Sequence, residues 1–379
     1  MDFALPEEHE AFRRVVRAFA ESEIAPHAEA WDRDHHFPLE VVRAMGDLGL
    51  FGLPFPEQYG GGGSDFLMFC VAVEEIARAD ASLAITLEAA VGLGANPIFH
   101  FGTDEQKQRW LPDLLAGKAL AAFALTEADS GSDAGSTRTK AVLDGDEWVI
   151  DGAKVFITNS GTAITSLVTV TARTPDGGIS TIMVPAGTPG LVIEPAYRKM
   201  GWRASDTHGV RFEGCRVPVG SLLGEAGRGL HQFLSILDDG RIAIGAMSVG
   251  IAGACLDLAV SFAEERSSFG RPIGHNQGVA FPLADLHVAV EAARLLTYRA
   301  AWLRDTGRPY KHAAAAAKLF ASETAVDATR LATQVFGGAG VMDDSAVSRF
   351  YRDAKILEIG EGTSEIQRLV IARWLGLSV

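Results

Sequence analysis

Hydrophobic residues recur at helical spacing through the first third of the chain. Between residues 6 and 115, apolar side chains return every three or four positions, as at Phe12 and Val16, which is the period of a helix with one buried face. Thr103 and Gln106 have the spacing of a capping box, in which each side chain satisfies a backbone N–H group of the other residue. The pattern predicts a run of helices, with one of them beginning near Thr103.

Four consecutive glycines occupy residues 60–63. A phosphate-binding loop would follow a strand and would usually precede a lysine, and neither is present here. We therefore interpret this run as a flexible connection between two helices.

The pattern changes between about residues 119 and 224 to short apolar runs. These runs are rich in Val, Ile and Thr and are separated by Asp-Gly or Gly-Gly turns, which is typical of β-strands. Residues 142–148 place Asp-Gly between two such runs, and this predicts a hairpin. Further strands are predicted at 166–173, 179–185 and 209–217.

Long helical patterns return after Gly229. They include the alanine-rich stretch 313–318, whose residues have high intrinsic helix propensity. The order helices, strands, helices predicts an α+β protein of three domains, which we place at residues 1–118, 119–225 and 226–379. A chain of 379 residues is long enough for that number.

Composition and charge narrow the class of partner. Hydrophobic residues make up 47% of the chain and charged residues 22%, which is a globular composition. A formal net charge of −14 opposes binding to nucleic acid or to anionic lipid, because both reward lysine and arginine. A phosphate-bearing small molecule stays compatible, since backbone N–H groups, helix N-termini and a few arginines can bind it locally. We expect no nucleic-acid partner.

The cysteines and the N-terminal residues indicate neither a metal site nor export. Cys70, Cys215 and Cys255 are far apart and form no Cys-x-x-Cys pair, so we expect buried free thiols, no disulfide and no metal. No apolar run approaches the ~18 to 20 residues that cross a bilayer, so no membrane insertion is expected. The first eight residues carry acids where a signal peptide needs a basic start, which predicts a cytoplasmic location.

Several common cofactor and catalytic motifs are missing. The patterns GxGxxG, GxxxxGK[ST], GxSxG and HExxH do not occur. Their absence argues against a Rossmann dinucleotide site, a P-loop, an α/β-hydrolase and a zinc protease. A bound nucleotide cofactor would have to be held by loops of the β domain and by helix ends.

The segment 352–368 contains the most informative carboxylate. Ser364 and Gln367 fit a capping box, so Glu361 and Gly362 are predicted to lie in the break before a helix. A carboxylate at such a break can project into a cleft, and Gly362 lets ligand atoms approach the backbone. For an arbitrary glutamate, a solvated surface position is the more common outcome.

The string Glu-Gly-Thr-Ser-Glu-Ile-Gln-Arg at 361–368, shortly after Arg-Asp-Ala-Lys, resembles the catalytic signature of the acyl-CoA dehydrogenases. The resemblance implies that Glu361 is the base that removes the alpha proton of an acyl-CoA thioester. It also implies a substrate contact at Gly362 and contacts with FAD at Thr363 and Glu365. The family fold that it implies has an N-terminal helical domain, a middle β-sheet or barrel-like domain, and a C-terminal four-helix bundle.

A second stretch, residues 123–133, ends an apolar strand in a loop of hydroxyls and glycine. By itself it could be a turn with satisfied hydroxyl groups. It resembles the family's Leu-Thr-Glu-x-x-x-Gly-Ser-Asp flavin loop. The resemblance implies FAD contacts at Phe123, Leu125 and Thr126, and it implies that Ser132 reaches both FAD and the acyl-CoA.

A third stretch, residues 154–159, is strand-like, and core packing is the ordinary role of its apolar side chains. It resembles the family's aromatic-Ile-Thr motif. The resemblance implies that Phe156 covers the flavin ring, that Ile157 belongs to the same site, and that the Thr158 hydroxyl hydrogen-bonds flavin N5. Phe156 stands where many relatives have Trp, so the aromatic area is smaller.

Asp238 and Arg241 lie three residues apart on a predicted helix, where an ordinary ion pair is the simplest interpretation. The family's Asp-x-x-Arg at this place contacts CoA, which implies substrate binding by both residues. Relatives of the isovaleryl and long-chain types carry their catalytic glutamate near Gly240. This chain has no carboxylate at that position, so the base stays assigned to Glu361.

Two further segments resemble parts of the family that hold the FAD pyrophosphate and adenosine. One contains Glu-Arg-x-x-Phe-Gly and a downstream glutamine, and the other Gln-x-x-Gly-Gly-x-Gly, which reaches the FAD of a neighbouring subunit. The implied FAD contacts are Arg266, Ser268, Phe269, Gln277, Gln334, Val335, Gly337 and Gly338. The resemblance therefore implies a homotetramer built as a dimer of dimers.

The resemblance implies oxidation of a short- to medium-chain acyl-CoA, branched or unbranched, to a trans-2-enoyl-CoA. Electrons would pass from FAD to an electron-transfer flavoprotein. The backbone N–H of Glu361 and a ribityl hydroxyl would stabilise the charge that forms on the thioester. Two alternatives stay open at this point: a flavin oxidase or monooxygenase on the same fold, and a non-catalytic acyl-CoA-binding flavoprotein.

Three positions bear on the acyl group. Gly360 stands where well-known relatives have Tyr, which removes a pocket wall. Ser82 stands near the position where glutaryl-CoA dehydrogenases carry Arg, so a dicarboxylic substrate is disfavoured. Glu88 is predicted to share that pocket helix, where it would shorten the pocket, meet a polar acyl group, or lie on a solvated face.

Overall fold

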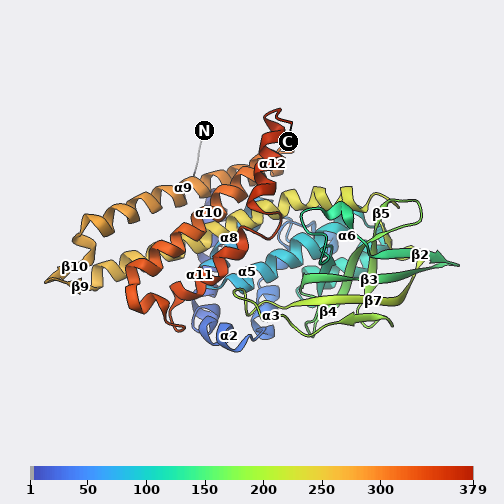
Figure 1. Cartoon of the computed structure of the whole chain (residues 1–379), viewed down its shortest axis with the longest axis horizontal. Coiled ribbons are helices and arrows are strands. Elements are labelled where there is room, and N and C mark those ends of the chain that lie inside the picture. Colours follow the sequence, from blue (N-terminus) through green and yellow to red (C-terminus); the bar gives the residue numbers. More distant parts are fainter. Residues whose placement is uncertain (1–3, 379) are drawn as a thin grey trace.

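The computed structural model describes residues 4–378, and the prediction drawn from the first residues lies partly outside this range. Figure 1 shows a β-sheet at one end of an elongated molecule and long helices that run to the other end. Helices of the first third pack between the sheet and the long helices. The expected order of helices, strands and helices is confirmed.

Short helices form the N-terminal part. Their bounds are α1 Glu7–Phe19, η1 Ala20–Ile24, α2 Ala28–Asp34, α3 Leu39–Asp47, η2 Leu50–Gly52, η3 Glu57–Tyr59, α4 Phe66–Ala79, α5 Ala81–Glu88, η4 Ala89–Ala95, α6 Asn96–Phe101 and α7 Asp104–Leu115. The capping box is confirmed, because the Thr103 hydroxyl accepts from the Gln106 N–H and the Gln106 side chain accepts from the Thr103 N–H. The segments η1 and η4 are π-helical.

The glycine run 60–63 connects η3 to α4, as interpreted, but it is a hydrogen-bonded turn rather than a flexible connection. A Cβ on Gly61 would lie 2.1 Å from the backbone oxygen of Phe55. Gly62 and Gly63 donate hydrogen bonds of 2.8 Å to the carbonyl oxygens of Gly52 and Phe55. Gly61 is required for this close backbone approach, and Gly60 and Gly63 have left-handed backbones, with φ of 86° and 65°, that favour glycine.

The middle part is one mixed sheet. Its strands are β1 Leu120–Ala124, β2 Lys140–Asp144, β3 Glu147–Thr158, β4 Thr165–Arg173, β5 Ile179–Pro185, β6 Leu191–Ile193, β7 Thr207–Pro218 and β8 Leu222–Leu223. The order is β6-β7-β3-β2-β4-β5-β8, and β1 pairs in parallel with β4. The predicted hairpin is confirmed, with Asp144 paired to Glu147. The three other predicted strands are confirmed as β4, β5 and β7.

Long helices form the C-terminal part. They are α8 Gly229–Glu265, α9 Gln277–Asp305, α10 Lys311–Phe336, α11 Ala346–Leu357 and α12 Ser364–Trp374, with the small hairpin β9 Ser267–Ser268 and β10 Arg271–Pro272 and the short turns η7 Ile273–His275 and η8 Gly337–Val341. The helices α8, α9 and α10 pack on one another, and α11 and α12 pack on α10. Small residues on α8 allow α4 to approach closely. A Cβ on Gly250 of α8 would lie 2.2 Å from the backbone oxygen of Glu74 in α4.

Two helical stretches, Ala81–Phe101 and Gly229–Glu265, are long and apolar enough by length and composition to cross a membrane. This finding corrects our expectation that no apolar run approaches the length that crosses a bilayer. In each stretch, 83% of the most apolar window is buried inside the protein. These two stretches are apolar because they pack in the core of the protein. The expected buried free thiols are confirmed at Cys70, Cys215 and Cys255.

Candidate active site

Glu361 lies in the short break between α11 and α12. Its backbone is left-handed, with φ of 55°, and Gly362 follows with φ of 92°. Two side chains fix the carbonyl oxygen of Gly362: Gln367 Nε2 and Lys318 Nζ each donate to it at 2.8 Å. An uncommon backbone conformation of a non-glycine residue persists only when its surroundings hold it, and here the anchors come from two different helices.

The helix after this break is capped differently from our prediction. The N-cap is Thr363, whose hydroxyl accepts from the Ile366 N–H at 3.3 Å, and Ser364 is the first helical residue. The predicted capping box of Ser364 with Gln367 is therefore wrong. The Gln367 side chain donates to the carbonyls of the break instead, because the left-handed turn aims them at it.

The Glu361 carboxyl group is enclosed. Its Oε2 atom is buried and has no hydrogen-bond partner among the described residues, although the residue as a whole is only partly buried. A Cβ added to Gly240 of α8 would lie 2.1 Å from Oε2. Burial raises the pKa of Glu361 to about 7, against the opposing effects of Arg241 and Lys318. A carboxylate with a near-neutral pKa is suited to act as a general base.

Two cations lie near this carboxyl group. Burial lowers the pKa of Lys318 to about 8, and the Glu361 charge opposes that shift. Arg241 is 4% exposed, and its Nη1 pairs with Asp238 Oδ1 at 2.5 Å. Asp238 itself has a raised pKa because it is buried. The predicted ion pair between Asp238 and Arg241 is therefore present, and Arg241 lies in the electrostatic range of Glu361.

Glu88 is fully buried at the end of α5, so a solvated face is excluded. Neither carboxylate oxygen has a hydrogen-bond partner among the described residues. Burial, and next the Glu361 charge, raise its pKa well above the ordinary value. A second carboxyl group therefore lies in the electrostatic range of the candidate base.

Trp202 lies beside Gly360. A Cβ on Gly360 would lie 3.9 Å from Cη2 of this indole, so an aromatic wall comes from the β domain. The Trp202 backbone is left-handed, with φ of 52°, and its N–H donates to Asp353 Oδ1 at 2.6 Å. Burial raises the pKa of Asp353 to about 7. The expected loss of a wall at Gly360 is thus offset by a residue that the sequence did not point to.

The two predicted flavin stretches of the β domain lie next to each other. The Val155 N–H donates to the Thr126 oxygen at 2.8 Å, which joins the loop to β3. Phe156 is 68% exposed and has φ of 62°, while Leu125, Thr126 and Thr158 are partly exposed and Ser132 is exposed. An exposed ring beside hydroxyl groups is suited to a flat polar cofactor such as a flavin.

Two predicted members of this group point into the core. The Phe123 ring is 7% exposed and stacks on Phe233 with ring centroids 4.7 Å apart. Ile157 is 2% exposed and belongs to the core of the sheet. Their side chains pack the site from behind, which leaves their backbones as the part available to a cofactor.

Thr363 and the exposed Glu365 lie at the start of α12, beside Glu361. The predicted FAD residues of the segments 266–277 and 334–338 lie at the other end of the molecule. The hairpin that carries Ser268 and Phe269 projects from the tip of the long helices, opposite the sheet (Figure 1). Phe269 is fully exposed with φ of 52°, and Arg266 and Gln277 are exposed. The segment with Gln334, Val335, Gly337 and Gly338 lies near this tip, because Phe336 stacks on Phe262 at 4.2 Å. One chain does not bring the two groups together.

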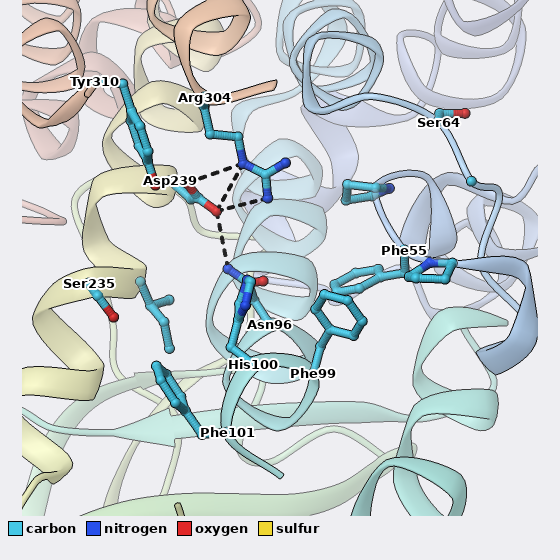
Figure 2. Close-up of a pocket in the computed structure, with 14 residues that line it drawn as sticks. Phe55, Ser64, Asn96, Phe99, His100, Phe101, Ser235, Asp239, Arg304 and Tyr310 are labelled. Carbon is cyan, nitrogen blue, oxygen red and sulfur yellow. Dashed lines mark hydrogen bonds and ion pairs between the residues drawn. The ribbon is translucent and has the colours of Figure 1, made fainter. Parts of the chain in front are cut away.

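A cavity of about 810 Å³ lies elsewhere, between α6, α8 and the loop before α4. Figure 2 shows Asp239 in its wall, bonded to Arg304, Tyr310 and Asn96. Neither Gly240 nor Glu361 is among the residues that line this cavity, so the enclosed carboxyl group of Glu361 is not part of its wall.

Sequence reasoning missed Lys318 and Trp202. Lys318 is 0% exposed and closes an alanine run, and a lone charge in an apolar helical stretch is a usable signal for a buried functional group. Trp202 had no such signal, because its place beside Gly360 depends on packing between the β domain and the C-terminal helices. A buried ion pair of Glu127 with Lys154, at 2.8 Å, holds the flavin loop and was also missed.

The fold and the candidate site together define the class of protein. The chain matches the acyl-CoA dehydrogenase N-terminal domain over residues 6–118, the middle domain over 122–215 and the C-terminal domain over 227–376. It therefore belongs to the acyl-CoA dehydrogenase family, which is a family of flavoprotein oxidoreductases. The predicted family and fold class are confirmed.

Individual relatives in the family show which activity class the chain belongs to. The chain is 50% identical over 378 residues to the "Probable acyl-CoA dehydrogenase YngJ" of Bacillus subtilis, covering 99% of this chain and 100% of that protein. It is 46% identical to the mitochondrial short-chain specific acyl-CoA dehydrogenase of Bos taurus, covering 97% and 90%. Identity at this level over nearly the whole chain shows that the protein is an acyl-CoA dehydrogenase.

Solved structures agree with the sequence relatives. The butyryl-CoA dehydrogenase of Megasphaera elsdenii superimposes with a TM-score of 0.96 at 39% identity, covering 99% of this chain and 100% of that chain. A chain in the structure of the electron transferring flavoprotein of Acidaminococcus fermentans gives a TM-score of 0.96 at 42% identity, covering 99% of each chain.

Proposed function

We propose that the protein catalyses the FAD-dependent alpha,beta-dehydrogenation of a short- to medium-chain acyl-CoA, with Glu361 as the base. The observation that carries the proposal is the enclosed Glu361 carboxyl group, which has a free Oε2 atom and a pKa raised to about 7. The product is a trans-2-enoyl-CoA. The short-chain relatives support the lower end of the chain-length range.

Glu361 removes the alpha proton, and neighbouring groups make that removal easier. The Glu361 backbone N–H donates to no other group among the described residues, so it is free to bind a thioester oxygen. Lys318 and Gln367 fix the next carbonyl and so hold the break rigid. Such preorganised donors stabilise charge where it develops during the reaction.

FAD, when bound, accepts the beta hydrogen as hydride. Thr126, Thr158 and Phe156 form the partly exposed edge that we assign to the flavin ring. Arg241, Asp238 and Ser132 are assigned to the CoA thioester side of the substrate. The proposed electron acceptor is an electron-transfer flavoprotein and the proposed location is the cytoplasm.

The distal group of FAD residues supports assembly from several chains. Arg266, Phe269 and Gln277 lie at the tip of the helices, far from the sheet (Figure 1). A second chain that places its tip at this chain's flavin edge would complete one FAD site. We propose a homotetramer, arranged as a dimer of dimers, with one FAD per chain and with domains at 1–118, 119–225 and 226–379.

The test is anaerobic mixing of the purified protein with butyryl-CoA while flavin absorbance is followed. We expect bleaching of the flavin and formation of an enoyl-CoA. Admission of air should restore the colour slowly, because fast reoxidation is the behaviour of an oxidase. A yellow protein that no acyl-CoA bleaches would be a non-catalytic binding protein.

The matched variant is Glu361→Gln, which keeps the shape of the side chain and removes its ability to accept a proton. We expect bleaching to slow by ~10² to 10⁴. FAD content should stay close to that of the wild type. Bleaching at the wild-type rate would reassign Glu361 to a structural role.

A further inference from the structure

The Glu88 carboxyl group has no use in the reaction as described. Glu88 is the last residue of α5 and is 0% exposed. No described residue donates a hydrogen bond to Oε1 or Oε2. Buried polar groups in folded proteins are almost always hydrogen-bonded, so an unpartnered buried carboxyl group calls for a partner from outside the chain.

The neighbours of Glu88 place it beside the reacting region. Glu361 is the charged group that acts on it. Two residues earlier, the Thr86 oxygen accepts from Asn159 Nδ2 at 3.1 Å, and Asn159 directly follows Thr158 at the proposed flavin edge. The segment that ends at Glu88 therefore contacts the proposed flavin edge through Thr86, and the Glu88 carboxyl group lies in the electrostatic range of Glu361.

Gly92 makes room for this carboxyl group. A Cβ at residue 92 would lie 2.9 Å from Glu88 Oε1. Gly92 belongs to the π-helical segment η4 that begins directly after Glu88. The missing side chain at Gly92 therefore leaves the space that Glu88 Oε1 occupies against its own helix.

The chemistry of the site selects one kind of partner. Without a cation beside it, a buried Glu88 is held in its neutral form, which has one O–H donor and a carbonyl acceptor. A hydrocarbon chain satisfies neither atom. An ionised chain end such as a carboxylate adds a negative charge next to Glu361. A hydroxyl or amide group accepts from the O–H and donates to the carbonyl.

We propose that Glu88 is a specificity-determining residue, which selects acyl-CoA substrates that carry a neutral hydroxyl or amide group on the acyl chain. This proposal rests on the proposed function, because it requires dehydrogenation of an acyl-CoA at Glu361. The indole ring of Trp202 lies beside Gly360, and its Nε1 is buried without a hydrogen-bond partner among the described residues.

The test compares matched pairs of substrates: butyryl-CoA with 4-hydroxybutyryl-CoA, and pentanoyl-CoA with 5-hydroxypentanoyl-CoA. The measured quantity is the ratio of kcat/KM for the hydroxylated and the alkyl substrate of each length. In the wild type we expect a ratio above one for at least one length. A site built to hydrogen-bond a substrate group discriminates strongly against the analogue that lacks it.

Two variants separate hydrogen bonding from shape. Glu88→Leu keeps the approximate volume without polar atoms and should lower the ratio by about tenfold or more, mainly by raising kcat/KM for the alkyl substrate. Glu88→Gln keeps a neutral group that donates and accepts and should retain most of the wild-type ratio. An equal ratio in the wild type and in E88L would overturn the proposal.

The failure of this proposal is distinct from failure of the proposed function. If no acyl-CoA of either kind bleaches the flavin, the dehydrogenase function fails. If alkyl substrates are oxidised and the wild type prefers them at both lengths, only the role of Glu88 fails. That second outcome needs no variant, so it decides the matter even if E88L does not fold.

Discussion

At the residue scale, the chemistry depends on how little space surrounds one carboxyl group. Gly240 has no side chain, and Glu361 Oε2 occupies the volume that a Cβ there would fill. The left-handed backbone at Glu361 aims the carboxyl group toward α8. Desolvation then raises its pKa, because the charged form loses more water than the neutral form.

Gly240→Ala tests this packing directly. The added Cβ would lie 2.1 Å from Glu361 Oε2, so the carboxyl group has to move. We expect a fall in kcat of at least about tenfold with FAD content retained, since small displacements of a catalytic group are costly. The control is Gly220→Ala, where the methyl group meets no atom within 4 Å and activity should be unchanged. Full activity in G240A would show that the carboxyl group is not confined there.

The raised pKa of Glu361 predicts how activity depends on pH. Only the ionised carboxylate accepts a proton, so kcat/KM should rise with pH and level off above about 7. A profile that is already flat from pH 5 upward would contradict a base with this pKa.

The same pKa also affects stability. The folded state holds a proton on Glu361 between its ordinary pKa of 4.5 and about 7, where the unfolded state has lost it. The free energy of unfolding should therefore fall as pH rises through this window. Urea titrations at pH 5 and pH 7 should show a smaller fall in E361Q than in the wild type. An equal fall in the free energy of unfolding in E361Q and in the wild type would indicate that the Glu361 carboxyl group is solvated.

At the element scale, α8 is the helix on which the site is assembled. It carries Gly240 and Arg241 toward the base and packs against α4, α9 and α10. Its small residues set how closely those helices approach. The break between α11 and α12 meets it through Glu361, and Lys318 of α10 ties down the same break.

Gly250→Ala should separate two of these helices. A Cβ there would lie 2.2 Å from the Glu74 oxygen of α4, and backbone atoms cannot step aside as a side chain can. Overpacking of this kind typically costs ~1 to 3 kcal/mol of unfolding free energy. Urea titration of G250A beside G220A would measure it. A G250A protein as stable as the wild type would mean that α4 and α8 can move apart freely.

At the scale of the whole molecule, the two halves of the proposed FAD site lie at opposite ends of one chain (Figure 1). The flavin edge is on the sheet, and the exposed Phe269 is at the tip of the long helices. The shape of the chain thus favours an assembly in which tips and sheets of different chains meet.

Light scattering together with flavin absorbance tests this assembly. We expect the mass of a homotetramer with one FAD per chain. Phe269→Ala should lower FAD occupancy, because it removes an aromatic surface at the proposed boundary. A monomer with full FAD occupancy would contradict the proposed shared site.

The sequence by itself determined the elements, their order and the family. Patterns of period three to four predicted the helices, and an Asp-Gly turn predicted the hairpin at 144–147. The string at 361–368 indicated the family and the proposed base, because all of these are local patterns. The cap at Thr363 was misplaced by one residue, since Ser, Thr and Gln fit more than one register and the left-handed turn decided between them.

Only the tertiary structure decided what surrounds Glu361. Gly240, Lys318, Trp202 and Glu88 come from four separate segments, and their approach depends on how the helices and the sheet pack. A one-dimensional pattern reports which face of an element is apolar, but not which distant residue meets it. Burial and the resulting pKa shifts follow from that packing, so the enclosure of two carboxyl groups at one site became visible only in the folded chain.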